Sequence, residues 1–196
     1  MRLALFLVLA ALASAQTPPE LENSWVRVSR IKLAPHEKLP PRPLADSVIV
    51  YLTDTRHKPG DVSWRKAGKY AETNPTNQPI EYVVTELKPP PANQPQPNVT
   101  LDPVKLDPQH HMVSFENARV RVIHTILEPH LQSPLHQHPH YVVVYITELH
   151  TTMVLADGKA VDNPRHPGDI AWRDFMQHQT ENIADRTALE IQIELK

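Results

Sequence analysis

The chain has 196 residues, no cysteine and a formal net charge of −2 with its histidines neutral. The lack of cysteine excludes disulfides, thiolate metal sites and cysteine nucleophiles, and without a run of basic residues a nucleic acid is not an expected partner. A content of 21 prolines against 4 glycines favours short strands joined by stiff turns over long helices.

The first fifteen residues have the organisation of a secretory signal. Met1-Arg2 supplies a positive start, residues 3–12 form an apolar run, and Ala13-Ser14-Ala15 offers small residues for cleavage. The apolar run is too short to span a bilayer, and an uncleaved anchor is the alternative. We therefore expect cleavage after Ala15, a periplasmic or secreted location and no membrane contact for the mature chain.

The rest of the chain is an internal repeat. Two stretches match at an offset of 94 residues, namely 22–28 with 116–122 and 48–53 with 142–147. Two later stretches match at an offset of 108, namely 59–65 with 167–173 and 86–88 with 194–196. One insertion of 14 residues, roughly 149–162, explains the change, and its Ala156-Asp157-Gly158-Lys159 is a good hairpin turn. The chain therefore contains a duplicated small domain.

A proline-rich segment separates the two copies. Residues 89–97 contain five prolines, so this run cannot join a sheet and favours a stiff, extended conformation. We therefore expect four segments, which are a signal peptide at 1–15, a first domain at 20–88, a linker at 89–112 and a second domain at 113–196.

The pattern within each copy is that of β-strands. Residues 119–126 largely alternate between polar and apolar, and residues 188–195 alternate strictly, as half-buried strands do. Residues 142–146 are continuously apolar, which indicates a strand covered on both faces. Many short strands with proline, asparagine and aspartate between them predict an all-β sandwich or barrel.

Histidines concentrate in the second copy. His136, His138 and His140 are two residues apart, a spacing that places side chains on one face of an extended segment. Pro139 favours a bend, which leaves the placement of His140 open. His178 lies on a later segment that can fold back beside the others.

The first copy is an internal control for these histidines. His136, His138 and His178 align with Arg42, Leu44 and Tyr70, which together cannot bind a metal ion. The first domain is therefore expected to be a packing partner that covers one face of the second.

Residues 128–182 resemble the cupin superfamily. Its first motif corresponds to Pro129-His130 through His136-Gln137-His138-Pro139, and its second to Pro167-Gly168-Asp169 leading to His178 and Asn182. The resemblance extends weakly, through the repeat, to the first copy. It implies a bicupin, that is, two tandem double-stranded β-helix barrels of the jelly-roll kind joined by the linker.

The resemblance also implies a divalent metal ion, Fe, Zn, Mn, Ni or Cu, bound by His136, His138 and His178. Imidazole nitrogens suit most of these ions, and geometry and supply choose among them. The carboxylate ligand usual in the family is replaced by Val142 or Val143, and His140 is the candidate to take its place.

The sequence is compatible with three functions. The first is a metal-dependent enzyme, dioxygenase-like or an isomerase, that acts on a small carbonyl or carboxylate compound. The second is a non-catalytic module that binds a metal ion or a small ligand, and the third is a scaffold built from two degenerate barrels. Proteins of this superfamily commonly form homodimers through barrel faces, but here the duplicated barrel offers the same contact within one chain.

Overall fold

The computed structural model describes residues 18–196, so the predicted signal peptide lies outside the described part. In chain order the first half contains β1 (Leu21–Glu22), β2 (Val26–Leu33), β3 (Arg42–Leu44), β4 (Ser47–Tyr51), β5 (Val62–Arg65), β6 (Gly68–Tyr70) and β7 (Ile80–Leu87). The second half contains α1 (Pro103–Leu106), β8 (His111–Glu116), β9 (Val120–Leu127), β10 (His136–His138), β11 (Tyr141–Tyr145), β12 (Leu149–Leu155), β13 (Ala160–Arg165), β14 (Ile170–Arg173), β15 (Met176–Asn182) and β16 (Ala188–Leu195). Within residues 18–196 no helix has the length and apolar character needed to cross a membrane.

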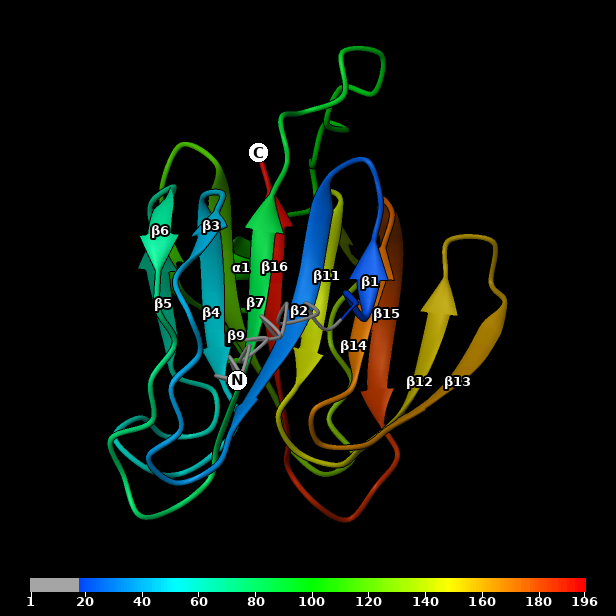
Figure 1. The fold of residues 1–196 in the computed structure, drawn as a ribbon. Helices are drawn as coiled ribbons and strands as arrows, with labels where there is room; N and C mark the ends of the chain where they lie inside the picture. The colour runs from blue at the N-terminus through cyan, green and yellow to red at the C-terminus, as the bar shows by residue number, and fades with distance from the viewer. Residues whose placement is uncertain (1–17) are drawn as a thin grey trace, which may run out of the picture.

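Each half of the chain forms two antiparallel sheets (Figure 1). The first half has a five-stranded sheet in the order β1-β2-β7-β4-β5 and a two-stranded sheet of β3 and β6. The second half has a five-stranded sheet in the order β14-β11-β16-β9-β8 and a four-stranded sheet in the order β10-β15-β12-β13. The predicted all-β fold of two tandem barrels is thus confirmed.

The predicted duplication reappears in the strand pairing. Arg42 is paired with Tyr70 in the first half, and the aligned residues His136 and His178 are paired in the second half. The predicted insertion is the hairpin of β12 and β13, whose turn places Gly158 at a φ of +81°, a conformation that glycine adopts readily. This hairpin widens the smaller sheet of the second barrel and projects from the side of the molecule (Figure 1).

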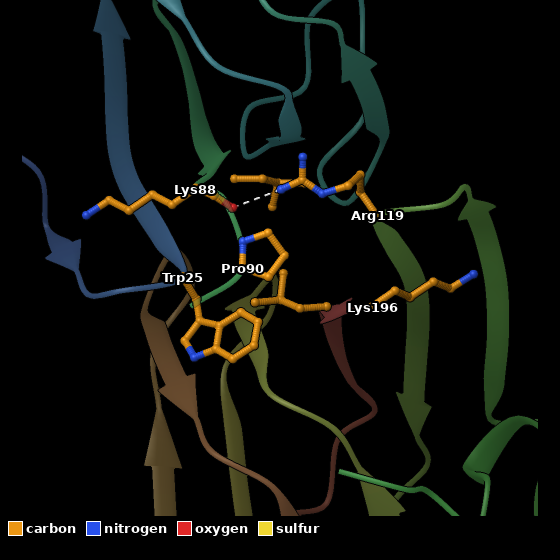
Figure 2. Close-up of a pocket in the computed structure, with 7 residues that line it drawn as sticks. Trp25, Lys88, Pro90, Arg119 and Lys196 are labelled. Atoms are coloured by element: carbon orange, nitrogen blue, oxygen red, sulfur yellow. Dashed lines mark hydrogen bonds between the residues drawn. The ribbon is translucent and has the colours of Figure 1, made fainter. Parts of the chain in front are cut away.

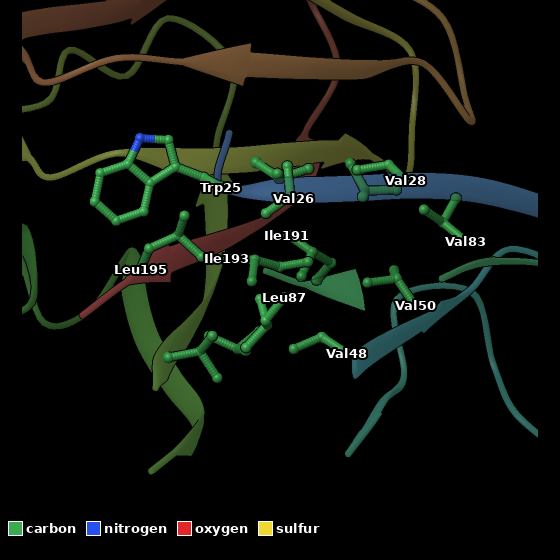
Figure 3. Packing of buried hydrophobic residues seen from close by; sticks show 14 of the residues in the cluster. Trp25, Val26, Val28, Val48, Val50, Val83, Leu87, Ile191, Ile193 and Leu195 are labelled. Atoms are coloured by element: carbon green, nitrogen blue, oxygen red, sulfur yellow. The ribbon is translucent and has the colours of Figure 1, made fainter. Parts of the chain in front are cut away.

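The two five-stranded sheets pack against each other and enclose the largest apolar core. Figure 3 shows side chains of both halves in it, among them Val26, Val48 and Ile193. The continuous apolar run of β11 divides between two cores, with Val142 in this shared core and Val143 in the smaller core of the second barrel. The prediction of a strand covered on both faces is confirmed, and the first barrel covers one face of the second.

The strict alternation of β16 has a different meaning from the expected half-buried strand. Its apolar residues Ile191 and Ile193 pack into the core shared by the two barrels. Its polar residues do not face solvent, because Gln192 and Glu194 are only 3% and 2% exposed. One face of β16 is therefore apolar and packs between the two barrels, and the other face is polar and points into the second barrel.

The part of the predicted linker that follows the proline-rich segment packs on the second barrel. The backbone N–H of Gln137 donates to the carbonyl oxygen of Leu101 at 2.8 Å, and the side-chain oxygen of Gln137 accepts from the backbone N–H of Thr100 at 2.8 Å. The predicted linker at 89–112 also contains α1 and the first two residues of β8. Thr100 and Leu101, within this range, are fixed to β10 by these hydrogen bonds.

The start of this connection closes one end of the interface between the barrels. Figure 2 shows Pro90 beside Trp25, with the Arg119 guanidinium donating to the carbonyl oxygen of Lys88 at 2.9 Å. The first barrel, the connection and the second barrel thus meet at one point, which ties the two halves together.

His36 in the first barrel and the equivalent His130 at the start of the first cupin motif both lie in exposed turns. His36 and His130 have φ values of 61° and 59°, in the left-handed region where glycine is favoured. The His130 ring lies 3.0 Å from the carboxylate of Asp185 and is far from buried. The recurrence of this conformation in both barrels shows that it belongs to the fold and not to the histidine cluster.

Candidate metal centre

Strand pairing brings three of the predicted histidines together. His136 and His178 lie opposite each other on β10 and β15, and His138 follows two residues later on the same face of β10. One ring nitrogen from each lies within 4.8 Å of the others, so a point within about 2.8 Å of all three exists (4.8 Å divided by √3). Zn–N bonds are near 2.0–2.1 Å, and side-chain adjustments of less than about 1 Å would reach that length.

Hydrogen bonds leave the right nitrogens of His136 and His138 free for a metal ion. Nδ1 of His136 donates to the carbonyl oxygen of Pro134 at 2.7 Å, and Nδ1 of His138 donates to the carboxylate of Glu194 at 2.8 Å. A carbonyl or carboxylate behind a histidine is the usual way to orient a metal ligand. Nε2 of His138 and Nδ1 of His178 are buried without a hydrogen-bond partner, which is costly unless another group satisfies them.

Burial keeps the three rings neutral. Removal from solvent lowers the pKa of His136 and lowers that of His138 and of His178 well below the usual value, with neighbouring imidazoles adding to the effect in the last two. Neutral imidazole is the form that binds metal ions. The residues present therefore fit a divalent cation in charge state, tautomer and position.

His140, the candidate fourth ligand, does not join this group. Its ring lies between Trp25, with ring centroids 5.0 Å apart, and Trp172, on which it stacks at 5.8 Å. β10 ends at His138 and β11 begins at Tyr141, so the alternation on which the prediction depended is broken at Pro139. His140 is thus part of the contact between the two barrels.

A fourth buried imidazole was not expected from the sequence. The ring centroid of His111 is 5.1 Å from that of His136 and 6.4 Å from that of His138, and His111 is 2% exposed. Burial lowers the pKa of His111 to about 4. No motif spacing marks it, since it comes from the first residue of β8 and reaches the cluster through the path of the chain after α1.

The structure also decides which valine stands where the family has its carboxylate ligand. Val143 lines the cavity inside the second barrel together with His178, whereas Val142 points into the core between the barrels. This cavity has a volume of about 20 Å³, enough for a water molecule but not for a large ligand. The cavity beside His178 is thus small.

Glu194 is the residue behind His138, and its replacement tests the orienting role. Its carboxylate is shared with Arg121, whose Nε donates to it at 2.6 Å, and burial raises the pKa of Glu194 while Arg121 opposes that shift. We expect Glu194→Gln to weaken zinc binding by about 10- to 100-fold, the usual cost of losing such a carboxylate. Competition with a chromogenic chelator measures the affinity, and Glu116→Gln, at a surface ion pair with Lys196, is the control. Equal zinc affinity in all three proteins would show that Glu194 has no such role.

Comparisons with known proteins show what this fold resembles. No protein-family model matches the chain, and no curated protein matches it. Among solved structures, AerE from Microcystis aeruginosa has a TM-score of 0.61 and 13% identity over 92% of this chain and 96% of its own. A salicylate 1,2-dioxygenase from Pseudoaminobacter salicylatoxidans has a TM-score of 0.58 and 10% identity over 87% and 69%, and an oxalate decarboxylase from Bacillus subtilis has 0.60 and 13% over 87% and 69%.

These likenesses cover both halves of the chain and concern its fold, since all the identities are low. Together with the two motifs and the three-histidine group, they define a protein with the cupin fold. Its particular form is the bicupin, with two barrels in one chain, of which only the second carries the histidines.

Proposed function

We propose that the chain is a periplasmic or secreted bicupin that binds one divalent metal ion through His136, His138 and His178. The observation that carries this proposal is the convergence of three buried imidazoles within 4.8 Å of one another, with unpartnered nitrogens on His138 and His178. In the first barrel the residue equivalent to His136 is Arg42, whose guanidinium donates to the carboxylate of Glu86 at 3.1 Å. The positive charge of an arginine there takes the place of a metal ion.

The activity that best suits this site is that of a dioxygenase-like enzyme on a small carbonyl or carboxylate compound. Three nitrogen ligands leave positions open for water or substrate, and a bound ion would supply Lewis acidity or redox chemistry. The chain itself orients His138 through Glu194, keeps the rings neutral and encloses the site in the barrel. Two of the similar structures are named a salicylate dioxygenase and an oxalate decarboxylase, which supports this class.

A non-catalytic metal- or ligand-binding module is the second candidate. The small volume of the cavity, about 20 Å³, and the valine in place of the family's carboxylate favour it. A cupin that holds a metal ion without turnover would need no larger space.

Metal analysis of protein secreted by its native host tests the proposal, because cytoplasmic expression can load a different ion. We expect about one transition-metal ion per chain, as three nitrogen ligands with open positions predict, and a mature N-terminus at Gln16. Oxygen consumption with a panel of small carboxylates and ketones then separates the two candidates. Metal-free protein from the native source would contradict metal binding, and metal-loaded protein without turnover would favour the binding module.

A further inference from the structure

The cavity of the second barrel contains an arginine without a carboxylate partner. Arg173, at the end of β14, lines the same cavity as His178 and donates from Nη2 to the side-chain oxygen of Asn163 at 3.1 Å. Within residues 18–196 no carboxylate oxygen lies within the 4.0 Å of an ion pair from its guanidinium. The acid in the cavity, Glu190, accepts instead from Gln192 at 2.8 Å, and burial raises the pKa of Glu190 to about 7.

The first barrel shows what a paired arginine looks like at this position. Arg65 is the residue equivalent to Arg173, and its Nη1 donates to the carboxylate of Glu72 at 2.7 Å. The second oxygen of Glu72 accepts from the hydroxyl of Tyr82, and Glu72 is 3% exposed. A buried carboxylate thus neutralises the arginine inside the barrel that lacks the histidines.

This carboxylate is missing from the barrel that has the histidines. At the offset of 108 residues that relates the two copies, Glu72 corresponds to Thr180. The same correspondence holds in the backbone, where Glu72 and Thr180 accept from the N–H groups of Leu39 and Ser133, both at 2.8 Å. The arginine has therefore been kept in both copies, and its acidic partner only in the one without a candidate metal centre.

Other polar atoms around this cavity also lack partners. The side-chain oxygen of Gln192 and Nδ1 of His178, both in the lining of this cavity, are buried without a hydrogen bond. Groups buried in this state usually meet a ligand or water. The guanidinium fork matches a carboxylate in two parallel hydrogen bonds.

We propose that Arg173 binds the carboxylate of a small organic acid in the second barrel, in the position that the Glu72 side chain occupies in the first. The inference rests on the proposed function, since it names the substrate class of the same site. The ligand's carboxylate would lie beside His178, so that the rest of a short acid faces the three histidines. The small cavity restricts the ligand to the shortest organic acids, such as acetate.

Binding of acetate, compared with its neutral analogue acetamide, tests this assignment. Titrations followed by NMR use the mature chain both zinc-loaded and metal-free, so that acetate held by Arg173 is distinguished from acetate held by zinc. We expect acetate to bind the metal-free protein at least tenfold more tightly than acetamide. Arg173→Gln should weaken acetate binding at least tenfold.

A second variant reproduces the arrangement of the first barrel. Thr180→Glu supplies an internal carboxylate to Arg173 and should weaken acetate binding at least tenfold, and Thr180→Gln, which fills the same space without a charge, should weaken it less than Thr180→Glu does. Equal binding of acetate and acetamide, or acetate binding unchanged in both Arg173→Gln and Thr180→Glu, would overturn the assignment. Zinc content is measured in every variant, so that loss of the metal centre is seen separately from loss of the anion.

Discussion

Replacement of His136 by alanine is expected to reduce bound metal from about one ion per chain to almost none. His136 is the central member of the cluster, because its ring centroid is 4.9 Å from that of His138 and 4.5 Å from that of His178. Its loss leaves two nitrogens, and removal of a direct ligand costs more than the 10- to 100-fold typical of an orienting partner. Metal content after dialysis, measured by mass spectrometry, checks the result.

The matched control is His140→Ala, two residues from the cluster. The His140 ring packs on Trp25 and Trp172, so this variant should lose some contact between the barrels and keep its metal ion. Circular dichroism confirms that both variants are folded. A His136→Ala protein that keeps one ion per chain, or a His140→Ala protein that loses it, would contradict the three-histidine centre.

Val143→Glu and Val142→Glu are expected to have opposite effects. At position 143 the new carboxylate enters the polar cavity beside His178 and restores a carboxylate ligand, so zinc affinity should rise at least tenfold. At position 142 it enters a fully apolar core, where Val142 is 0% exposed, and an unpaired buried charge of this kind should cost more than about 4 kcal/mol. Chelator competition measures the first effect, and urea denaturation measures the second.

Val143→Gln and Val142→Leu separate charge from size at the two positions. The glutamine variant should not gain the zinc affinity of Val143→Glu, because a neutral amide is a poor substitute for a carboxylate. The leucine variant should unfold at a urea concentration close to that of the unaltered chain. A Val142→Glu protein that is stable and binds zinc more tightly would show that the two faces of β11 have been assigned the wrong way round.

Pairs of equivalent residues explain why so much of the fold was visible in the sequence. The repeat aligned Arg42 with His136 and Tyr70 with His178. Arg42 faces Tyr70 across β3 and β6, and His136 faces His178 across β10 and β15. Alignment of the two copies predicts which residues pair across strands, because equivalent residues must occupy equivalent positions in two barrels of the same fold. The insertion at 149–162 could be located for the same reason.

The positions of the His140 and His111 side chains could not be predicted from the sequence. Period-2 spacing linked His140 to the cluster, but a single proline between two strands turned it toward Trp25. His111 had no pattern around it, yet it lies beside His136 because α1 and β8 return the chain to the barrel. Both outcomes depend on the path of loops, which local periodicity does not describe.

Strands, the duplication, the hairpin insertion and three histidines of the cluster could be predicted from the amino-acid sequence, because each of these has a local or repeated pattern. The three-dimensional packing of the strands was needed to show that the polar face of β16 is directed into the barrel and that Glu194 supports His138. It was also needed to show that Arg173 has lost the acidic partner that Arg65 keeps. These contacts are between residues on different strands, and only the packing of two sheets brings those strands together.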